Sequence, residues 1–352
     1  MPDQKVQAAV TNWAPRFIAM GIDYNDYFRT TGRIERWEDW CREWCVTGDL
    51  HADLAAKAEA KSNRVSAGEA YVTAALCYHF GKFLFQDHPD EYMAAATRSI
   101  ETYRQGAKLL DPTAEKLRVP FEGVSLFGIL RRPLGVGRPP LVLLLPGLDS
   151  VKEEFFRWEE FFLKRGMATF SFDGPGQGEG GFHTHIRPDY EKAVSAALDV
   201  LDQRSDIDPK RTGAVGVSMG SYYAVRALAY ESRVKAAVGN CGPYNMGECF
   251  DVLPELTQSS FLYHSGARDL AEARAIAHHL TLQDAASKIK QPLLVIHGRL
   301  DRIIPLEQAH KIANAVGPSA KLVVYENGNH VCNNIPYLYR PLTADWLKEK
   351  LG

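Results

Sequence analysis

The stretch Thr-Gly-Ala-Val-Gly-Val-Ser-Met-Gly-Ser-Tyr-Tyr, residues 212–223, joins an apolar run to a Gly-x-Ser-x-Gly turn and then to a helical pattern. A strand is predicted over residues 212–217 and a helix from Tyr222 onwards. A serine on so tight a turn needs small neighbours, because strand and helix approach closely on either side of it. This is the context of a nucleophile elbow, and it predicts Ser218 as a catalytic nucleophile. An ordinary glycine-rich turn is the alternative interpretation.

Strand and helix patterns alternate on both sides of this motif. The predicted strands are residues 116–120, 124–131, 141–145, 168–172, 212–217, 234–239, 293–297 and 321–325, and the predicted helices are 152–165, 190–203, 222–230 and 306–316. Such alternation favours an α/β fold with a mainly parallel, doubly wound sheet and helices on both faces. Residues 244–290 are long and mostly helical, so we predict a helical insertion that shapes a substrate pocket.

The first third of the chain has a different pattern. Apolar residues recur at three- and four-residue spacing over residues 37–45, 50–62, 66–86 and 90–110, which predicts helices. A chain of 352 residues also exceeds the usual size of one domain. We therefore expect a helical region at residues 1–112 and a catalytic domain at residues 113–352.

A serine hydroxyl needs a base, and the base needs an orienting acid. In this fold they follow the nucleophile in the chain order Ser, Asp, His. Asp301 leaves the strand predicted at 293–297 and is expected to be the acid, with a turn or capping role as the alternative. His330 follows the last predicted strand in a glycine-containing loop and is the best placed of the 11 histidines.

The carbonyl oxygen becomes negative during attack, so we expect two backbone N–H groups to face it. Met219 directly follows the nucleophile, and Leu148 lies in the loop after the strand predicted at 141–145. Ser150 and Glu153 are spaced as a capping box, which predicts a helix N-terminus there. Asp149 adjoins Leu148, so we expect it to lie near the substrate, unless it only favours this helix start.

Other chemistries fit the sequence less well. The Gly-rich segment 173–180 lacks the Lys-Ser/Thr of a phosphate loop and the acid of a dinucleotide fingerprint, so it is interpreted as a structural turn. His183 with His185, or Cys41 with Cys45, lack a second matched pair at zinc-like spacing. We expect neither a metal nor a cofactor.

Charge and cysteine usage restrict the partners and the compartment. The chain has 41 Lys and Arg against 43 Asp and Glu, a net charge of −2, which does not favour a nucleic-acid or membrane-surface partner. No apolar run is long enough to cross a bilayer. Residues 1–10 are polar and do not predict an export signal, so the six cysteines are expected to be reduced thiols in a cytoplasmic protein.

Four motifs carry a resemblance to a known family, and one of them is Arg-Gly-Met-Ala-Thr at 165–169. The other three are Pro-Gly-Leu-Asp-Ser-Val-Lys-Glu-Glu at 146–154, Asp-Gly-Pro-Gly-Gln-Gly-Glu at 173–179 and Gly-Asn-His-Val-Cys-Asn-Asn at 328–334. With them the chain resembles the α/β-hydrolase-fold C–C bond hydrolases typified by 2,6-dihydroxypseudooxynicotine hydrolase, and more distantly the fungal polyketide-shortening hydrolases. The resemblance implies the same triad, a homodimer, and residues 1–112 as part of a lid. It also implies a substrate-binding or proton-handling role for Asp149, where the typifying enzyme has a glutamate, which is one methylene longer.

The expected reaction is hydrolysis of a small-molecule carbonyl compound through an acyl-enzyme on Ser218. The bond cleaved is either a C–C bond beside a ketone or an ester bond, and expulsion of a carbon leaving group needs an acid or an electron sink. A carboxylesterase acting on medium-sized esters is the second hypothesis. A third, from a different class, is a hydrolase-fold receptor that binds a small ligand with little turnover.

Overall fold

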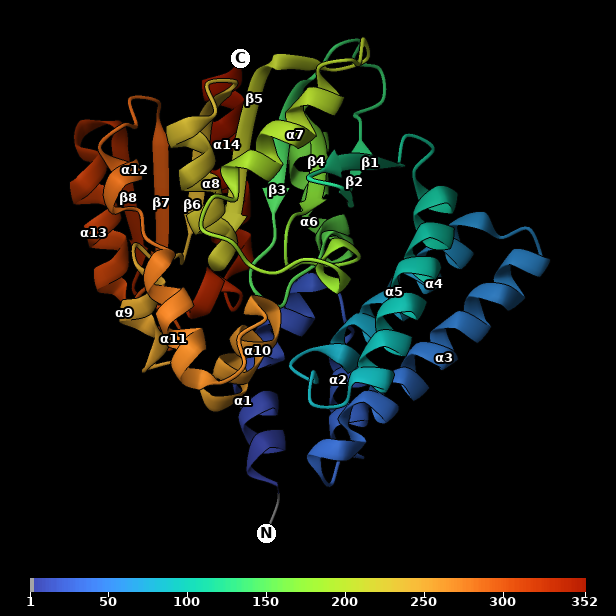
Figure 1. The fold of residues 1–352 in the computed structure, drawn as a ribbon. Helices are drawn as coiled ribbons and strands as arrows, with labels where there is room; N and C mark the ends of the chain where they lie inside the picture. The colour runs from blue at the N-terminus through green and yellow to red at the C-terminus, as the bar shows by residue number, and fades with distance from the viewer. Residues whose placement is uncertain (1–2) are drawn as a thin grey trace. The chain divides into compact units, whose positions relative to one another are not determined.

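The structure is a computed structural model that describes residues 3–352. It divides into two compact units, Met1–Ala114 and Glu115–Gly352. Their helices and strands are drawn in Figure 1.

The first unit is helical. Its α-helices are α1 (Gln4–Met20), α2 (Tyr24–Thr31), α3 (Trp40–Ala60), α4 (Arg64–Lys82) and α5 (Pro89–Leu110). Aromatic side chains fill its core, where Phe17 stacks on Phe80 at a centroid distance of 3.8 Å and meets Trp44 edge-on at 5.2 Å. Such pairs add to the stability gained by burying the rings.

Helix α3 corrects the expectation of two separate helices at residues 37–45 and 50–62. It runs without a break through Gly48, where a Cβ atom would lie 2.4 Å from the Tyr78 ring. Gly48 therefore marks the close packing of α3 on α4 rather than the end of a helix.

The second unit contains one eight-stranded sheet. Its strands are β1 (Glu115–Phe121), β2 (Val124–Arg131), β3 (Pro140–Leu145), β4 (Ala168–Asp173), β5 (Asp208–Val217), β6 (Val234–Asn240), β7 (Leu293–Gly298) and β8 (Ala320–Tyr325), in the order β1-β2-β4-β3-β5-β6-β7-β8. Strands β1 and β2 pair antiparallel, as do β2 and β4, and all other neighbours are parallel. The predicted mainly parallel sheet is confirmed.

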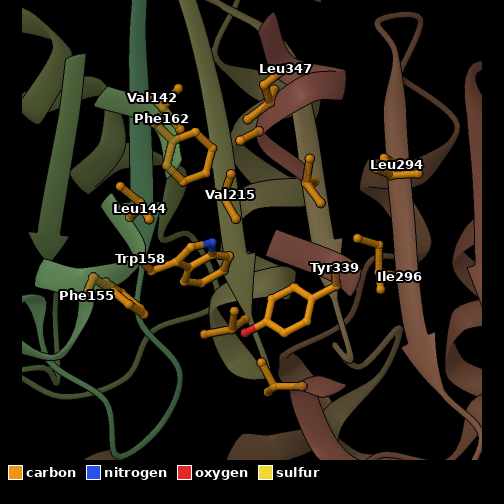
Figure 2. Close-up of a cluster of buried hydrophobic side chains, with 14 of the residues drawn as sticks. Val142, Leu144, Phe155, Trp158, Phe162, Val215, Leu294, Ile296, Tyr339 and Leu347 are labelled. Atoms are coloured by element: carbon orange, nitrogen blue, oxygen red, sulfur yellow. The ribbon is translucent and has the colours of Figure 1, made fainter. Parts of the chain in front are cut away.

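Helices cover both faces of this sheet. Side chains of α6 (Phe156–Leu163) and α14 (Pro336–Leu351) form one apolar cluster with alternate residues of β3, β5, β6 and β7. Figure 2 shows this cluster, in which Trp158 meets Tyr339 edge-on at 5.6 Å. Helix α8 (Met219–Tyr230) lies on the opposite face, where Gly239 of β6 adjoins Ser221 and Val225. Both faces of the central strands are therefore dry, as a parallel sheet requires.

The remaining helices occupy the connections between strands. Helix α7 (Glu191–Leu201) precedes β5, and α13 (Leu306–Val316) lies between β7 and β8. Between β6 and β7 the chain forms α9 (Met246–Phe250), α10 (Glu255–Ser265), α11 (Leu270–His279) and α12 (Gln283–Ala286). These four helices fall within the interval 244–290 predicted as a helical insertion.

Parallel strands place their carboxyl ends at one edge of a sheet, and ligand sites in such sheets lie outside that edge. Strands β3, β5, β7 and β8 all end in loops that contain predicted site residues. No helix within residues 3–352 is both long enough and apolar enough to cross a membrane.

Candidate active site

Ser218 lies on a backbone turn between β5 and α8 that few residue types adopt. Its φ is +55° and its ψ is −124°, outside the regions that ordinary side chains favour. A Cβ on Gly216 would lie 1.8 Å from the Gly220 carbonyl oxygen, and a Cβ on Gly220 would lie 2.0 Å from the Leu145 carbonyl oxygen. In both cases the clash would be with backbone atoms, which cannot move aside as a side chain can. Glycine is therefore required at both positions, as expected for a nucleophile elbow.

The structure brings the three predicted triad residues together. The His330 Nε2 atom lies 3.0 Å from the Ser218 hydroxyl oxygen, and its Nδ1 atom lies 2.8 Å from the Asp301 Oδ2 atom. Both are hydrogen-bond distances. The serine, imidazole and carboxylate are therefore linked by a continuous series of hydrogen bonds, although the three residues follow three different strands.

The Asp301 carboxylate is held in its ionised state. Burial acts to raise its pKa, but the interaction with His330, together with smaller contributions from His297 and the Ile304 N–H, outweighs burial, and the pKa lies below its ordinary value. The other carboxylate oxygen of Asp301, Oδ1, accepts hydrogen bonds from the N–H groups of Ile303 and Ile304 at 2.8 and 3.0 Å. An ionised carboxylate only accepts, so Nδ1 of His330 carries the proton and Nε2 is left to accept from Ser218.

The loop that carries His330 is fixed at several points. The Asn240 side-chain amide donates to the Val331 carbonyl at 3.0 Å, from the end of β6. Gly298 lies against the same loop, since a Cβ there would be 2.4 Å from the carbonyl oxygens of Gly328 and Asn329. The loop after β7, which carries Asp301, and the loop after β8, which carries His330, therefore meet at Gly298 and Gly328. This close approach allows His330 to hydrogen-bond to Asp301.

The predicted oxyanion donors belong to the two segments that meet at the nucleophile, the loop after β3 and the start of α8. Met219 is the first residue of α8, and the first amide groups of a helix have no carbonyl within the helix to bind. Leu148 is buried in the loop after β3. Its neighbour Gly147 lies so close to the elbow that a Cβ would be 3.1 Å from that of Ser218.

The predicted capping box at Ser150 is wrong. A short 3-10 helix over Lys152–Phe155 begins there, with Val151 at its N-cap and no side-chain cap. The Ser150 hydroxyl donates to Glu154 instead. The Lys152 N–H donates to Asp173 at 2.7 Å, so a carboxylate from a distant strand takes the role expected of the serine.

Asp149 is buried and faces the insertion. Its Oδ1 atom accepts a hydrogen bond from the Ser260 hydroxyl of α10 and lies 4.0 Å from the Nε2 atom of His264. The carboxylate is therefore joined to α10, one residue away from the proposed oxyanion donor. No local sequence pattern indicates this contact between the loop and the insertion, which joins residues 111 positions apart.

Two of the residues weighed as metal ligands are surface residues, and two others, Cys41 and Cys45, lie on α3 of the first unit. His183 and His185 are exposed in the loop before α7. Within residues 3–352, Cys241 with Asp301 and His330 places ligand-type atoms within 4.8 Å of one another. Both nitrogens of His330 are hydrogen-bonded there, and burial raises the pKa of the Cys241 thiol well above its ordinary value. This arrangement fits a proton relay better than a metal centre.

The comparisons with known proteins agree with this geometry. A model of the family described as Esterase FrsA-like matches residues 24–258, more than half of the chain. The chain belongs to the FrsA-like esterase family. It is 34% identical over 349 residues to a 2,6-dihydropseudooxynicotine hydrolase of Paenarthrobacter nicotinovorans, covering 99% of this chain and 94% of that protein.

Two further relatives place this family member among hydrolases. The crystal structure of a 2,6-dihydroxy-pseudo-oxynicotine hydrolase superposes with a TM-score of 0.89 at 34% identity, covering 97% of this chain and 96% of that one. The 20-hydroxy-prefusarin hydrolase FUS2 of Gibberella moniliformis is 34% identical over 245 residues, which are 65% of this chain and 58% of that protein. The chain is therefore a hydrolase with the α/β-hydrolase fold, and the predicted resemblance is confirmed.

Proposed function

We propose that this FrsA-like esterase is a serine hydrolase that forms an acyl-enzyme on Ser218. The supporting observation is the unbroken hydrogen-bonded chain from Ser218 through His330 to Asp301. The Ser218 oxygen bonds to the substrate carbonyl carbon while its proton passes to Nε2 of His330. The tetrahedral intermediate then breaks the scissile bond, the leaving group takes that proton, and water releases the acyl group by the same route.

In this proposal the N–H groups of Leu148 and Met219 stabilise the negative oxygen of the intermediate. They belong to the two segments that meet at the elbow, the loop after β3 and the start of α8. Donors fixed by the fold need no reorganisation during the reaction, and each contributes about 10²–10³-fold to the rate in comparable sites.

We propose a C–C bond beside a ketone as the bond cleaved, with an ester as the second candidate. A carbon leaving group is much more basic than an alkoxide, so its departure requires a proton or an electron-accepting substituent. Asp149 is the group proposed to meet that demand, because it is buried and adjoins Leu148. The names of the relatives support hydrolysis in general, and the bond choice rests on the family resemblance and on Asp149.

We also propose that residues 1–112 contribute to a lid and to a homodimer in the cytoplasm. The Paenarthrobacter relative matches over 99% of this chain, so its similarity includes this helical region. The cysteines are all free thiols, as a reducing compartment favours. Sedimentation velocity should give twice the 39.3 kDa mass of the chain. A mass of one chain at micromolar concentration would contradict the dimer.

The nucleophile assignment predicts that Ser218→Ala abolishes turnover of an activated ester, with a loss of about 10³-fold or more in kcat/KM. The hydroxyl is needed for covalent attack, and its removal takes away little packing. Ser221→Ala is the matched control. That serine is buried in the first turn of α8, three residues after Ser218, and its hydroxyl has no hydrogen-bond partner among the described residues, so activity should be unchanged. Retention of more than a tenth of the activity in Ser218→Ala, at unchanged Tm, rejects the nucleophile.

The proton-handling role predicts that Asp149→Asn slows cleavage of a ketone substrate by about 10²-fold while sparing an ester with the same acyl group. An alkoxide leaving group needs no such help. Asparagine keeps an oxygen that can accept from Ser260, so the loop should stay joined to α10. Ser260→Ala removes that contact and keeps the carboxylate, and it should affect both substrates alike. Equal loss of both reactions in Asp149→Asn would exclude the role.

A further inference from the structure

The glycine-rich turn after β4 holds the loop that carries Leu148. Gln177, in the middle of this turn, is almost fully buried. Its side-chain Nε2 atom donates to the carbonyl oxygens of Pro146 and Gly147 at 2.7 and 2.8 Å. One side chain therefore binds two successive backbone carbonyls of the proposed oxyanion loop, across a separation of 30 residues.

The orientation of the Gln177 amide is determined by its other contacts. Its Oε1 atom accepts from the Gly174 N–H at 3.0 Å and from the Tyr190 hydroxyl at 2.8 Å. A flipped amide would place Oε1 against two carbonyl oxygens and Nε2 against the Gly174 N–H, losing three of the four bonds, because only the Tyr190 hydroxyl could accept instead of donate. Both hydrogens of Nε2 are therefore committed to the loop. The Tyr190 ring is itself held by stacking on Tyr223 at 3.7 Å.

Fixing the Gly147 carbonyl also fixes an N–H group. The carbonyl of Gly147 and the N–H of Leu148 belong to one planar trans peptide unit, in which they point in opposite directions. Holding the oxygen at Gln177 therefore directs the Leu148 N–H away from Gln177. The same unit adjoins the nucleophile, since a Cβ on Gly147 would be 3.0 Å from the Val217 carbonyl oxygen and 3.7 Å from the Ser218 hydroxyl oxygen.

A buried ionic cluster supports the far end of the same loop. Asp173, which opens the turn, accepts from the backbone N–H of Lys152 at 2.7 Å and from its Nζ atom at 3.0 Å. The Lys152 ammonium also pairs with Glu153 and Glu179 at 2.7 and 2.9 Å. Residues 173–179 thus bind the loop at its beginning through Gln177 and at its end through Asp173.

We propose that Gln177 is a positioning residue that sets the direction of the Leu148 N–H in the oxyanion hole. This inference rests on the proposed acyl-enzyme mechanism. Gln177 acts on the reaction through the Gly147–Leu148 peptide, so its removal should weaken stabilisation of the developing oxyanion and leave substrate binding almost unchanged. Hydrogen bonding to the Gly147 carbonyl also polarises the peptide and strengthens its N–H as a donor.

The test is Gln177→Met, which keeps a chain of similar length and removes both donors. Thr184→Val is the matched control. Its hydroxyl binds the Gly176 N–H and the Gly180 carbonyl within the same turn at 2.9 and 2.6 Å, away from Gly147. For an activated ester, Gln177→Met should lower kcat by about 10²-fold with KM within about twofold, and Thr184→Val should leave both unchanged.

A trifluoromethyl ketone separates an oxyanion effect from general damage to the fold. Attack by Ser218 on its carbonyl gives a hemiketal whose oxygen is negative, as in the intermediate, while the proton goes to His330. Its inhibition constant should rise in Gln177→Met by about the factor lost in kcat/KM. Tyr190→Phe removes one of the two hydrogen bonds to the Oε1 atom of Gln177, and it should raise the inhibition constant by a smaller factor. It provides the same test where Gln177→Met does not fold.

The two proposals fail in different ways. A wild-type protein that the ketone does not inhibit contradicts the acyl-enzyme mechanism itself. A wild-type protein that it inhibits, together with a Gln177→Met or Tyr190→Phe variant of unchanged inhibition constant, contradicts only the role of Gln177. A fall in kcat with an unchanged inhibition constant likewise assigns Gln177 a structural role and overturns the inference.

Discussion

The strained turn at Ser218 is the constraint on which the site depends. Ser218 has a φ of +55°, which few residues other than glycine adopt, and backbone atoms crowd the turn at Gly216 and Gly220. A non-glycine residue in this region stores about 1–3 kcal/mol, which the surrounding structure must offset. The dry packing of α8 and of the central strands supplies that support. The histidine loop and the loop after β3 both approach the position that this turn defines.

The polar part of the site is held by backbone contacts more than by charge. Asp301 is fixed by two N–H groups, the histidine loop by the Asn240 amide, and the loop of the proposed oxyanion donor Leu148 by Gln177. Buried networks of this kind define one geometry when every member has a partner. A catalytic hydroxyl and two backbone donors must be aligned closely, because small displacements lower the rate strongly. The site residues stand in loops, but each loop is anchored to a strand end.

The sequence predicts those features that depend on local pattern. The turn 216–220 requires its glycines locally, and the sheet follows from alternating apolar runs, so Ser218 and the parallel strands were predictable. Asp301 and His330 followed from chain order. The contacts of Gln177 and Asp149 join segments 30 or more and 111 residues apart, and no periodicity encodes them. The capping box at Ser150 failed for the same reason, since Asp173 competes for the Lys152 N–H from another strand. The prediction of two helices in place of α3 is wrong because Gly48 resembles a helix-ending glycine in the sequence, whereas in the structure it is required for packing against Tyr78.

The most direct test of the account is to identify the covalent intermediate. A fast-quenched reaction with a p-nitrophenyl ester, followed by proteolysis and mass spectrometry, should place the added acyl mass on the peptide that contains Ser218. A burst of nitrophenol equal to the enzyme concentration should accompany it. Turnover with no acylated peptide and no burst, or acylation confined to another residue, would contradict the assignment of Ser218 as the nucleophile.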